Sequence, residues 1–144
     1  MSLKKHLGGC YCGSVKFEID GKIRSVVYCH CGQCRKMSGP FMAATSAPNE
    51  RFQLTKDEGL TWFQSSPEAE RGFYNKCGTP LFWRETPSDR ISICAGALDN
   101  PDVLDEAGHI FVADKPDWYD LHDGLPKFDY GDDGSLRREI HEPA

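Results

Sequence analysis

The chain has 144 residues, of which 39% are hydrophobic, and its formal net charge is −5. This length suits a single domain with a modest hydrophobic core, and the lack of a basic stripe argues against a nucleic-acid-binding protein. No apolar run approaches the roughly 18 residues of a membrane helix, and the N-terminal lysines precede no apolar stretch like that of a signal peptide. We therefore expect a cytoplasmic protein that binds neither nucleic acid nor membranes.

Short stretches of β-branched and aromatic residues, separated by glycine and proline turns, follow one another from residue 15 onward. Residues 15–19 alternate between apolar and polar side chains, which is typical of a half-buried strand. Residues 32–38 are expected to form one or two helical turns, and no longer segment has the period of an amphipathic helix. The pattern predicts a mainly β protein, with further strands over residues 25–29, 41–45, 52–55, 60–64, 72–75, 81–84, 91–95 and 110–113.

The strand pattern weakens toward the C-terminus, where acidic residues accumulate. From Asp114 to the end there are nine Asp or Glu residues against four Lys or Arg, whereas the preceding part of the chain is balanced. We expect a zinc-binding domain over residues 1–120 and an acidic C-terminal extension over residues 121–144. The polar end of this extension is expected to be partly mobile and exposed to solvent.

Seven cysteines are the most informative feature of the composition. Their number is odd, and in a reducing compartment clustered cysteines bind metal more often than they form disulfides. Cys29, Cys31 and Cys34, called the central triad below, place three thiols within six residues. Three protein ligands with a fourth position left open for water or an external thiol are typical of a catalytic zinc site. The spacing predicts zinc here, and a neighbouring side chain that closed the fourth position would make the site structural.

A second pair, Cys10 and Cys12, lies between glycines that allow the backbone to turn both sulfurs toward one ion. Cys77 is its expected distant partner. Zinc held by these three residues, called the N-terminal triad below, would join separate parts of the chain and is expected to be structural. The chain would then bind up to two zinc ions.

Three motifs together resemble the glutathione-dependent formaldehyde-activating enzyme family, which is also represented by centromere-protein-V-like proteins. They are Gly-x-Cys-x-Cys-Gly-x-Val at residues 8–15, Cys-His-Cys-x-x-Cys-Arg at 29–35 and Cys-Gly-Thr-Pro-Leu-Phe at 77–82. The resemblance extends over roughly residues 8–120. It implies a β-tent fold of coiled antiparallel sheets with two zinc sites. The central triad would hold the zinc associated with catalysis, and the first Cys-x-Cys would share a structural zinc with a late Cys-x-x-Cys pair.

The late pair departs from the family pattern, because Tyr74 stands where the first of its cysteines is expected. A phenol with a pKa near 10 is a poor zinc ligand. The fourth ligand at the N-terminal triad would therefore be water or another side chain, or the triad would hold no metal. Cys94 is a spare cysteine within a predicted strand. We expect it to act as a small buried hydrophobic residue, and a role as the replacement ligand is the alternative.

Residues beside the central triad are candidates for supporting roles. His30 lies between two ligands and is expected to point away from them and form hydrogen bonds, with a proton shuttle as the alternative. Arg35 and Lys36 follow the triad directly, and Arg35 is the candidate for binding a carboxylate of an acidic ligand such as glutathione. The alternative is a solvated surface pair. Four large aromatic residues in strand-like contexts are expected in the core rather than on a ligand-binding wall: Trp62, Phe63, Trp83 and Trp118.

The resemblance implies a zinc-dependent carbon–sulfur lyase that joins glutathione and formaldehyde into S-hydroxymethylglutathione, reversibly, or that acts on a related thiol adduct. Zinc on the central triad would take the sulfur of a small thiol at its open position and lower the pKa of that thiol. Two other functions are compatible with the same cysteines. One is a non-enzymatic, zinc-stapled module that binds a protein partner. The other is a thiol or metal sensor, which would have a low-pKa, readily oxidised cysteine but no turnover.

Overall fold

The computed structural model describes residues 4–143 and is built almost entirely from short strands. One α-helix, α1 (Gly32–Ser38), and single 3₁₀ turns at Asn49–Arg51, Ala95–Ala97, Pro101–Val103 and Val112–Asp114 interrupt them. The strands are β1 (Lys5–Gly9), β2 (Lys16–Asp20), β3 (Ile23–Arg24), β4 (Val26–Cys29), β5 (Met42–Pro48), β6 (Phe52–Lys56), β7 (Leu60–Gln64), β8 (Ala69–Tyr74), β9 (Pro80–Glu85), β10 (Arg90–Cys94), β11 (Glu106–Ile110) and β12 (Glu139–His141).

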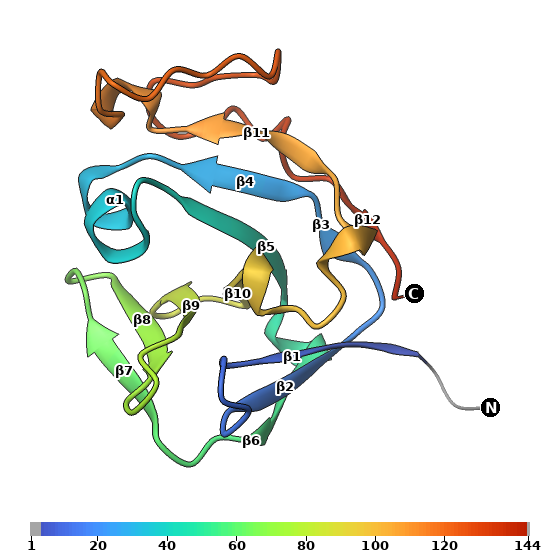
Figure 1. Cartoon of the computed structure of the whole chain (residues 1–144). Coiled ribbons are helices and arrows are strands. Elements are labelled where there is room, and N and C mark those ends of the chain that lie inside the picture. Colours follow the sequence, from blue (N-terminus) through green and yellow to red (C-terminus); the bar gives the residue numbers. More distant parts are fainter. Residues whose placement is uncertain (1–3, 144) are drawn as a thin grey trace.

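A strongly curved sheet forms the body of the fold, with the strand order β11-β4-β5-β10-β9-β8-β7. Figure 1 shows it bending from β11 and β4, through β5 and β10, to the β7–β8 hairpin. A three-stranded sheet, β1-β2-β6, faces the middle of the curve, and β12 pairs with β3 in a small third sheet. Every pairing is antiparallel except that of β11 with β4, which is parallel. The expected fold of several coiled antiparallel sheets with little helix is confirmed.

The alternation seen in the sequence decides which side chains enter the core. On β2, Phe17 and Ile19 are buried while their neighbours face outward, and Ile91 and Ile93 do the same on β10. The ring of Phe82 on β9 packs edge-on against Phe17, with ring centroids 5.4 Å apart. Burial of such side chains between the three-stranded sheet and the curved sheet supplies the main stabilisation of the fold.

Four strands differ from the sequence-based expectation. The short strands β3 and β12, which pair with each other, were not predicted, and β12 lies in the polar end that was expected to be exposed and partly mobile. β1 was not predicted, because Lys5–Gly9 ends in two glycines and carries little of the usual strand composition. It forms because its backbone pairs with β2 from Lys5 opposite Asp20 to Gly9 opposite Lys16. The strand expected over residues 110–113 is wrong in position. Glu106–Ile110 is the strand, and Phe111 leaves it with a positive φ of 56° before a 3₁₀ turn.

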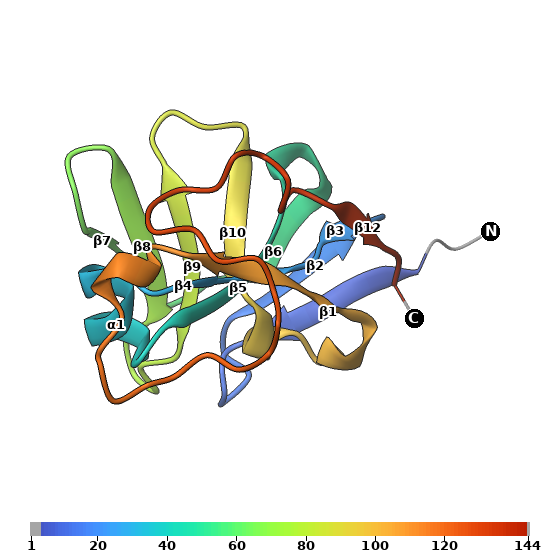
Figure 2. The same cartoon turned by 90° about the horizontal axis from the view of Figure 1, so that it is seen from above.

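The segment after residue 120 packs on the outer edge of β11 and then reaches β3 (Figures 1 and 2). The amide of His109 donates to the carbonyl of Pro126 at 2.9 Å, and the amide of Phe128 donates to the carbonyl of His109 at 3.0 Å. Gly108 is required at this crossing, because a Cβ there would lie 2.8 Å from the Pro126 oxygen. Leu136 is 3% exposed and packs in a small core with Val27. The acidic extension therefore contributes strand pairing and buried area to the fold, while mobility at its end stays a prediction.

Within residues 4–143, no helix has the length and apolar character needed to cross a membrane.

His6 on β1 gives the fold a modest sensitivity to acid. It is 5% exposed, and its Nε2–H donates to the carbonyl of His141 at 3.1 Å. Burial lowers the pKa of His6 below its usual 6.5, so the unfolded chain takes up a proton before the folded chain does. This contribution to stability is complete above pH 6.5 and is lost as the pH falls below it, at up to about 1.4 kcal/mol per pH unit.

We expect His6→Gln to unfold with a weaker pH dependence than the wild type between pH 6.5 and 5.5. Urea unfolding of both proteins at several pH values measures the difference. Metal loss at low pH affects both chains alike and cancels in the comparison. Parallel pH dependences for the two proteins would show that His6 is not a source of the acid sensitivity.

Candidate metal centre and adjoining cavity

The central triad lies where β4 ends and α1 begins. Cys29 is the last residue of β4, Cys31 is the N-cap of α1, and Cys34 lies in the first turn of the helix. The Cys31 sulfur accepts a hydrogen bond from the Cys34 amide at 3.3 Å, as a capping side chain does. The amide of His30 donates to the carbonyl of Ile110 at 3.0 Å, which fastens the loop to the end of β11. This tight turn brings the three sulfurs within 4.8 Å of one another.

The donor set of the central triad fits zinc. Sulfurs bound to one tetrahedral zinc lie about 3.8 Å apart, given Zn–S bonds of about 2.3 Å, so the observed spread needs little adjustment. No fourth His, Cys, Asp or Glu of residues 4–143 shares this cluster. The chain would therefore hold the ion with three thiolates and leave one position for a ligand from outside.

Hydrogen bonding among the three sulfurs favours ionisation of one of them. The thiols of Cys29 and Cys34 both bond to Cys31, which lowers the pKa of the Cys31 thiol to about 2. The same bond, in which Cys29 is the donor, raises the pKa of the Cys29 thiol above its usual range. The lowered pKa favours the thiolate form of Cys31, which is the form that binds metal.

Arg71 on β8 makes direct contact with the triad. Its Nη2 donates to the sulfur of Cys34 at 3.3 Å, its Nε donates to Gln33 Oε1 at 2.8 Å, and its Nη1 lies 3.7 Å from the sulfur of Met42. The side chain is buried and forms no ion pair with a carboxylate among the described residues. Its positive charge therefore faces the cysteine sulfurs. Sequence reasoning missed Arg71, since it lies 37 residues from Cys34.

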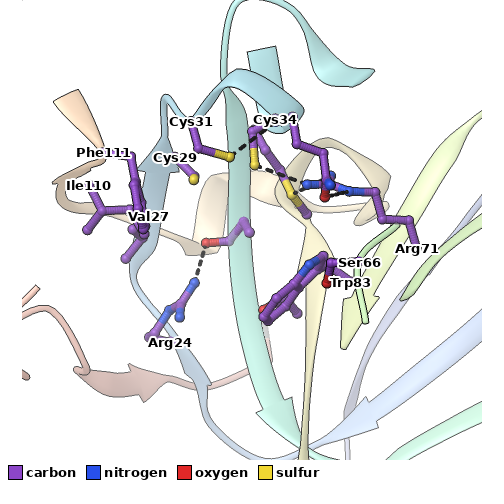
Figure 3. Close-up of a pocket in the computed structure, with 14 residues that line it drawn as sticks. Arg24, Val27, Cys29, Cys31, Cys34, Ser66, Arg71, Trp83, Ile110 and Phe111 are labelled. Atoms are coloured by element: carbon purple, nitrogen blue, oxygen red, sulfur yellow. Dashed lines mark hydrogen bonds between the residues drawn. The ribbon is translucent and has the colours of Figure 1, made fainter. Parts of the chain in front are cut away.

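A cavity of about 370 Å³ opens from the central triad into the curved sheet (Figure 3). In Figure 3 the three cysteines lie at one end, Arg24 at the other, and Trp83 faces Val27 and Phe111 across the space. The rest of the lining mixes apolar and polar side chains, and no Asp or Glu contributes to it. The full lining consists of Arg24, Val27, Cys29, Cys31, Gln33, Cys34, Met42, Ala44, Ser66, Arg71, Trp83, Ser92, Ile110 and Phe111.

His30 belongs to a hydrogen-bonded chain behind the metal-binding loop that runs from two buried histidines to the surface residue Asp123. Its Nε2 lies 2.8 Å from Nδ1 of His109, and Nε2 of His109 lies 2.7 Å from Oδ2 of Asp123. With Nε2 of His109 donating to the carboxylate, its Nδ1 is the atom placed to accept from His30. Burial, followed by the nearby His109, lowers the pKa of His30 to about 4, so its ring is neutral. The hydrogen-bonding role expected for His30 fits this geometry, whereas its partners were not foreseen.

The N-terminal triad also assembles, because the sulfurs of Cys10, Cys12 and Cys77 lie within 4.8 Å of one another. The Val15 amide donates to the Cys10 sulfur at 3.2 Å. Hydrogen bonding with Thr79 lowers the pKa of the exposed Cys77 thiol to about 6, which favours a thiolate there. These features suit zinc, and the cluster includes no fourth His, Cys, Asp or Glu of the described residues.

Tyr74 belongs to the hydrophobic core. It is 7% exposed, and its ring lies so close to Gly59 that a Cβ on that glycine would be 2.5 Å from Cε1. The residue that replaces a cysteine of the family pattern therefore fills space between β7 and β8. Cys94 lies beside Cys34 and Met42 in a separate small cluster. Burial raises the pKa of its thiol to about 11, and it belongs to neither triad, so it fits the expectation of a small buried side chain.

The structure also shows where the two basic residues after the central triad and the four large aromatic residues lie. Arg35 is half-buried and Lys36 exposed on α1, and neither lines the cavity. Trp62 is partly buried and packs against the core as expected. The expectation for the other three aromatic residues is wrong, because Trp83 lines the cavity while Phe63 and Trp118 are 52% and 76% exposed. Alternation along a strand cannot show that one of its faces borders a hollow rather than packed side chains.

Fold and site together define a β protein with two sulfur-rich triads suited to metal, one of which lies at the end of a cavity. The family model for the glutathione-dependent formaldehyde-activating enzyme matches residues 5–114, and the chain belongs to this family. A Schizosaccharomyces pombe protein named as an uncharacterized lyase is 28% identical over 121 residues, which cover 83% of this chain and 87% of the relative. The crystal structure of a Rhodobacter sphaeroides protein superimposes with a TM-score of 0.59 at 22% identity, covering 72% of this chain and 98% of that one, and supports the fold.

Proposed function

We propose that this chain is a zinc-dependent carbon–sulfur lyase that interconverts S-hydroxymethylglutathione with glutathione and formaldehyde, or that acts on a related thiol adduct. Membership of the family and the lyase name of the fungal relative support this class of reaction. The observation that carries the proposal is the position of the central triad. Its three sulfurs converge at the end of a cavity, with no fourth protein ligand among the described residues to close the site.

The residues of the cavity have distinct roles in the proposed reaction. Cys29, Cys31 and Cys34 would hold zinc, and Arg71 fixes the Cys34 sulfur through its hydrogen bond. Zinc bound here would supply a position at which an external thiol loses its proton. Apolar side chains such as Val27, Ile110 and Phe111 lower the local dielectric constant, which would strengthen electrostatic interactions within the cavity.

The proposed reaction needs neither an oxidant nor a reductant. In the direction of adduct formation, the thiol sulfur forms a bond to the carbonyl carbon of formaldehyde, and the carbonyl oxygen takes up a proton in place of the one lost from sulfur. The reverse direction breaks the carbon–sulfur bond. Arg35 follows Cys34 directly on α1, and its binding to an acidic group of the thiol stays a prediction.

Exchange spectroscopy on an equilibrium mixture of glutathione and ¹³C-labelled formaldehyde tests the proposal. We expect zinc-loaded protein to accelerate exchange between the adduct and free formaldehyde in proportion to protein concentration, beyond the spontaneous rate. The Cys31→Ser variant is expected to give no acceleration beyond the spontaneous rate. If the wild-type protein neither accelerates exchange nor binds millimolar glutathione, a non-enzymatic zinc module replaces the lyase as the interpretation. Oxidation of a cysteine without turnover would instead indicate a sensor.

A further inference from the structure

The cavity beside the central triad has an unusual charge balance. Two arginines, Arg24 and Arg71, contribute to its lining, and no Asp or Glu does. Arg71 is already engaged with Cys34, Gln33 and Met42. Arg24 is the positive charge of this lining that is not committed to the metal-binding sulfurs.

Arg24 is held in place by the backbone rather than by a counter-ion. Its Nη2 donates to the carbonyl of Ala44 at 2.8 Å, and its Nε donates to the carbonyl of Ser25 at 3.2 Å. No carboxylate of the described residues forms an ion pair with it. Burial, and then the nearby Arg90, lowers the pKa of its guanidinium to about 10. Arg24 is half-buried, and a cation partly removed from water without an anionic partner is unfavourable, so an anion that entered the cavity would relieve this cost.

The acids near Arg24 form no ion pair with it. Asp132 and Glu139 partly offset the lowering of the Arg24 pKa, and Asp132 accepts hydrogen bonds from the amides of Gly134 and Leu136 instead. A neighbouring cavity of about 500 Å³ shares Arg24, Trp83 and Ser92 with the first. Of the two acids lining it, Glu139 is paired with Arg51 and Arg90, and Glu85 forms no ion pair with Arg24. Figure 3 shows the Arg24 guanidinium across the cavity from the cysteines, at the end away from the metal-binding loop.

We propose that Arg24 binds a carboxylate of the thiol ligand, so that the cavity selects thiols with an acidic group at the end remote from sulfur. The inference rests on the proposed function, since it requires the ligand's sulfur to lie at the central triad. For glutathione, the carboxylate that matches Arg24 is that of the glycyl end. The γ-glutamyl carboxylate is accompanied by an ammonium group, which Arg24 would repel, whereas the glycyl carboxylate carries an uncompensated negative charge.

Binding of glutathione and of its glycyl monoethyl ester to zinc-loaded protein, measured by calorimetry, tests this inference. The ester keeps the thiol and the γ-glutamyl end and removes only the charge that Arg24 would meet. We expect the wild type to bind glutathione about tenfold more tightly than the ester, the effect of losing one charged hydrogen bond. In Arg24→Met the two affinities should agree within about twofold, and Arg24→Lys should retain part of the preference.

Arg138→Met is the matched control, since Arg138 pairs with Asp105 on the surface and lines neither cavity. This variant should keep the full preference for the free acid. Equal binding of acid and ester by the wild type would overturn the role of Arg24 and leave the proposed function standing, as would a preference that survives in Arg24→Met. Failure of the wild type to bind either thiol would overturn both. If Arg24→Met does not fold, the wild-type comparison and Arg24→Lys still decide the outcome.

Discussion

Cys31→Ser is expected to lower the zinc content by about one equivalent per chain and to abolish acceleration of the glutathione–formaldehyde exchange. Cys31 occupies the middle of the central triad, accepts hydrogen bonds from both neighbouring thiols and is the sulfur most readily ionised. A serine hydroxyl is a poor ligand for zinc at neutral pH, so the site would lose one of its three protein donors. Elemental analysis of wild type and variant, purified side by side, measures the loss.

Cys94→Ser is the matched control for this experiment. It removes a sulfur that packs beside Cys34 yet belongs to neither triad, so its zinc content should equal that of the wild type. Zinc that remains in Cys31→Ser should be lost on further substitution of Cys12, which belongs to the N-terminal triad. An unchanged zinc content in Cys31→Ser would place the metal on the N-terminal triad alone and remove the basis of the proposed catalysis.

Arg71→Met is expected to weaken zinc binding at the central triad by about 10- to 100-fold, the range found when a partner of a metal ligand is removed. Methionine fills similar space but cannot donate to the Cys34 sulfur or to Gln33. The loss also removes the positive charge that faces three thiolates. In the metal-free protein, the unpaired groups should lower the free energy of unfolding by about 1–3 kcal/mol. Competition with a chromophoric chelator measures the affinity, and urea unfolding measures the stability.

Two further variants show whether the effect on zinc affinity comes from the guanidinium of Arg71 or from any loss of an arginine near the site. Arg71→Lys keeps the charge without the planar fork, and an intermediate affinity is expected. Arg84→Met removes an arginine on the neighbouring strand β9 that pairs with Glu70 and lies over the ring of Trp62, and it should leave zinc affinity unchanged. If Arg71→Met binds zinc as tightly as the wild type, Arg71 has no part in holding the metal-binding sulfurs.

Strands whose burial alternates could be predicted from the sequence, and so could both cysteine triads. Residues 15–19 predict β2 because Phe17 and Ile19 face the core, and Cys29, Cys31 and Cys34 are so close in sequence that a single turn assembles them. In contrast, β1 depends on pairing with β2, and its own residues give little sign of a strand. Its stability comes from tertiary context rather than from local propensity.

The residues that contact the metal-binding loop could not be predicted from the spacing of residues in the sequence. His109 meets His30 across 79 residues, and Arg71 meets Cys34 across 37. Such contacts depend on which strands pair, here β11 beside β4 and β8 beside the start of α1, and no local pattern encodes that order. Arg24 could not be predicted either, because the sequence around it does not show that no carboxylate pairs with it in the fold. An arginine next to apolar or small residues within a strand, as at Ile23-Arg24-Ser25 and Arg71-Gly72-Phe73, is the only local signal that the sequence offers for either residue.

Titration of glutathione into cobalt-substituted protein tests the central claim most directly, because thiolate-to-cobalt charge-transfer absorption reports an additional sulfur ligand. Cys31→Ser, in which only the N-terminal triad would hold metal, provides the baseline to subtract. The open central triad predicts a saturable rise in this absorption at millimolar glutathione in the wild type and none in the variant. An unchanged spectrum in the wild type would mean that the fourth position does not accept an external thiol, and it would contradict the proposed lyase.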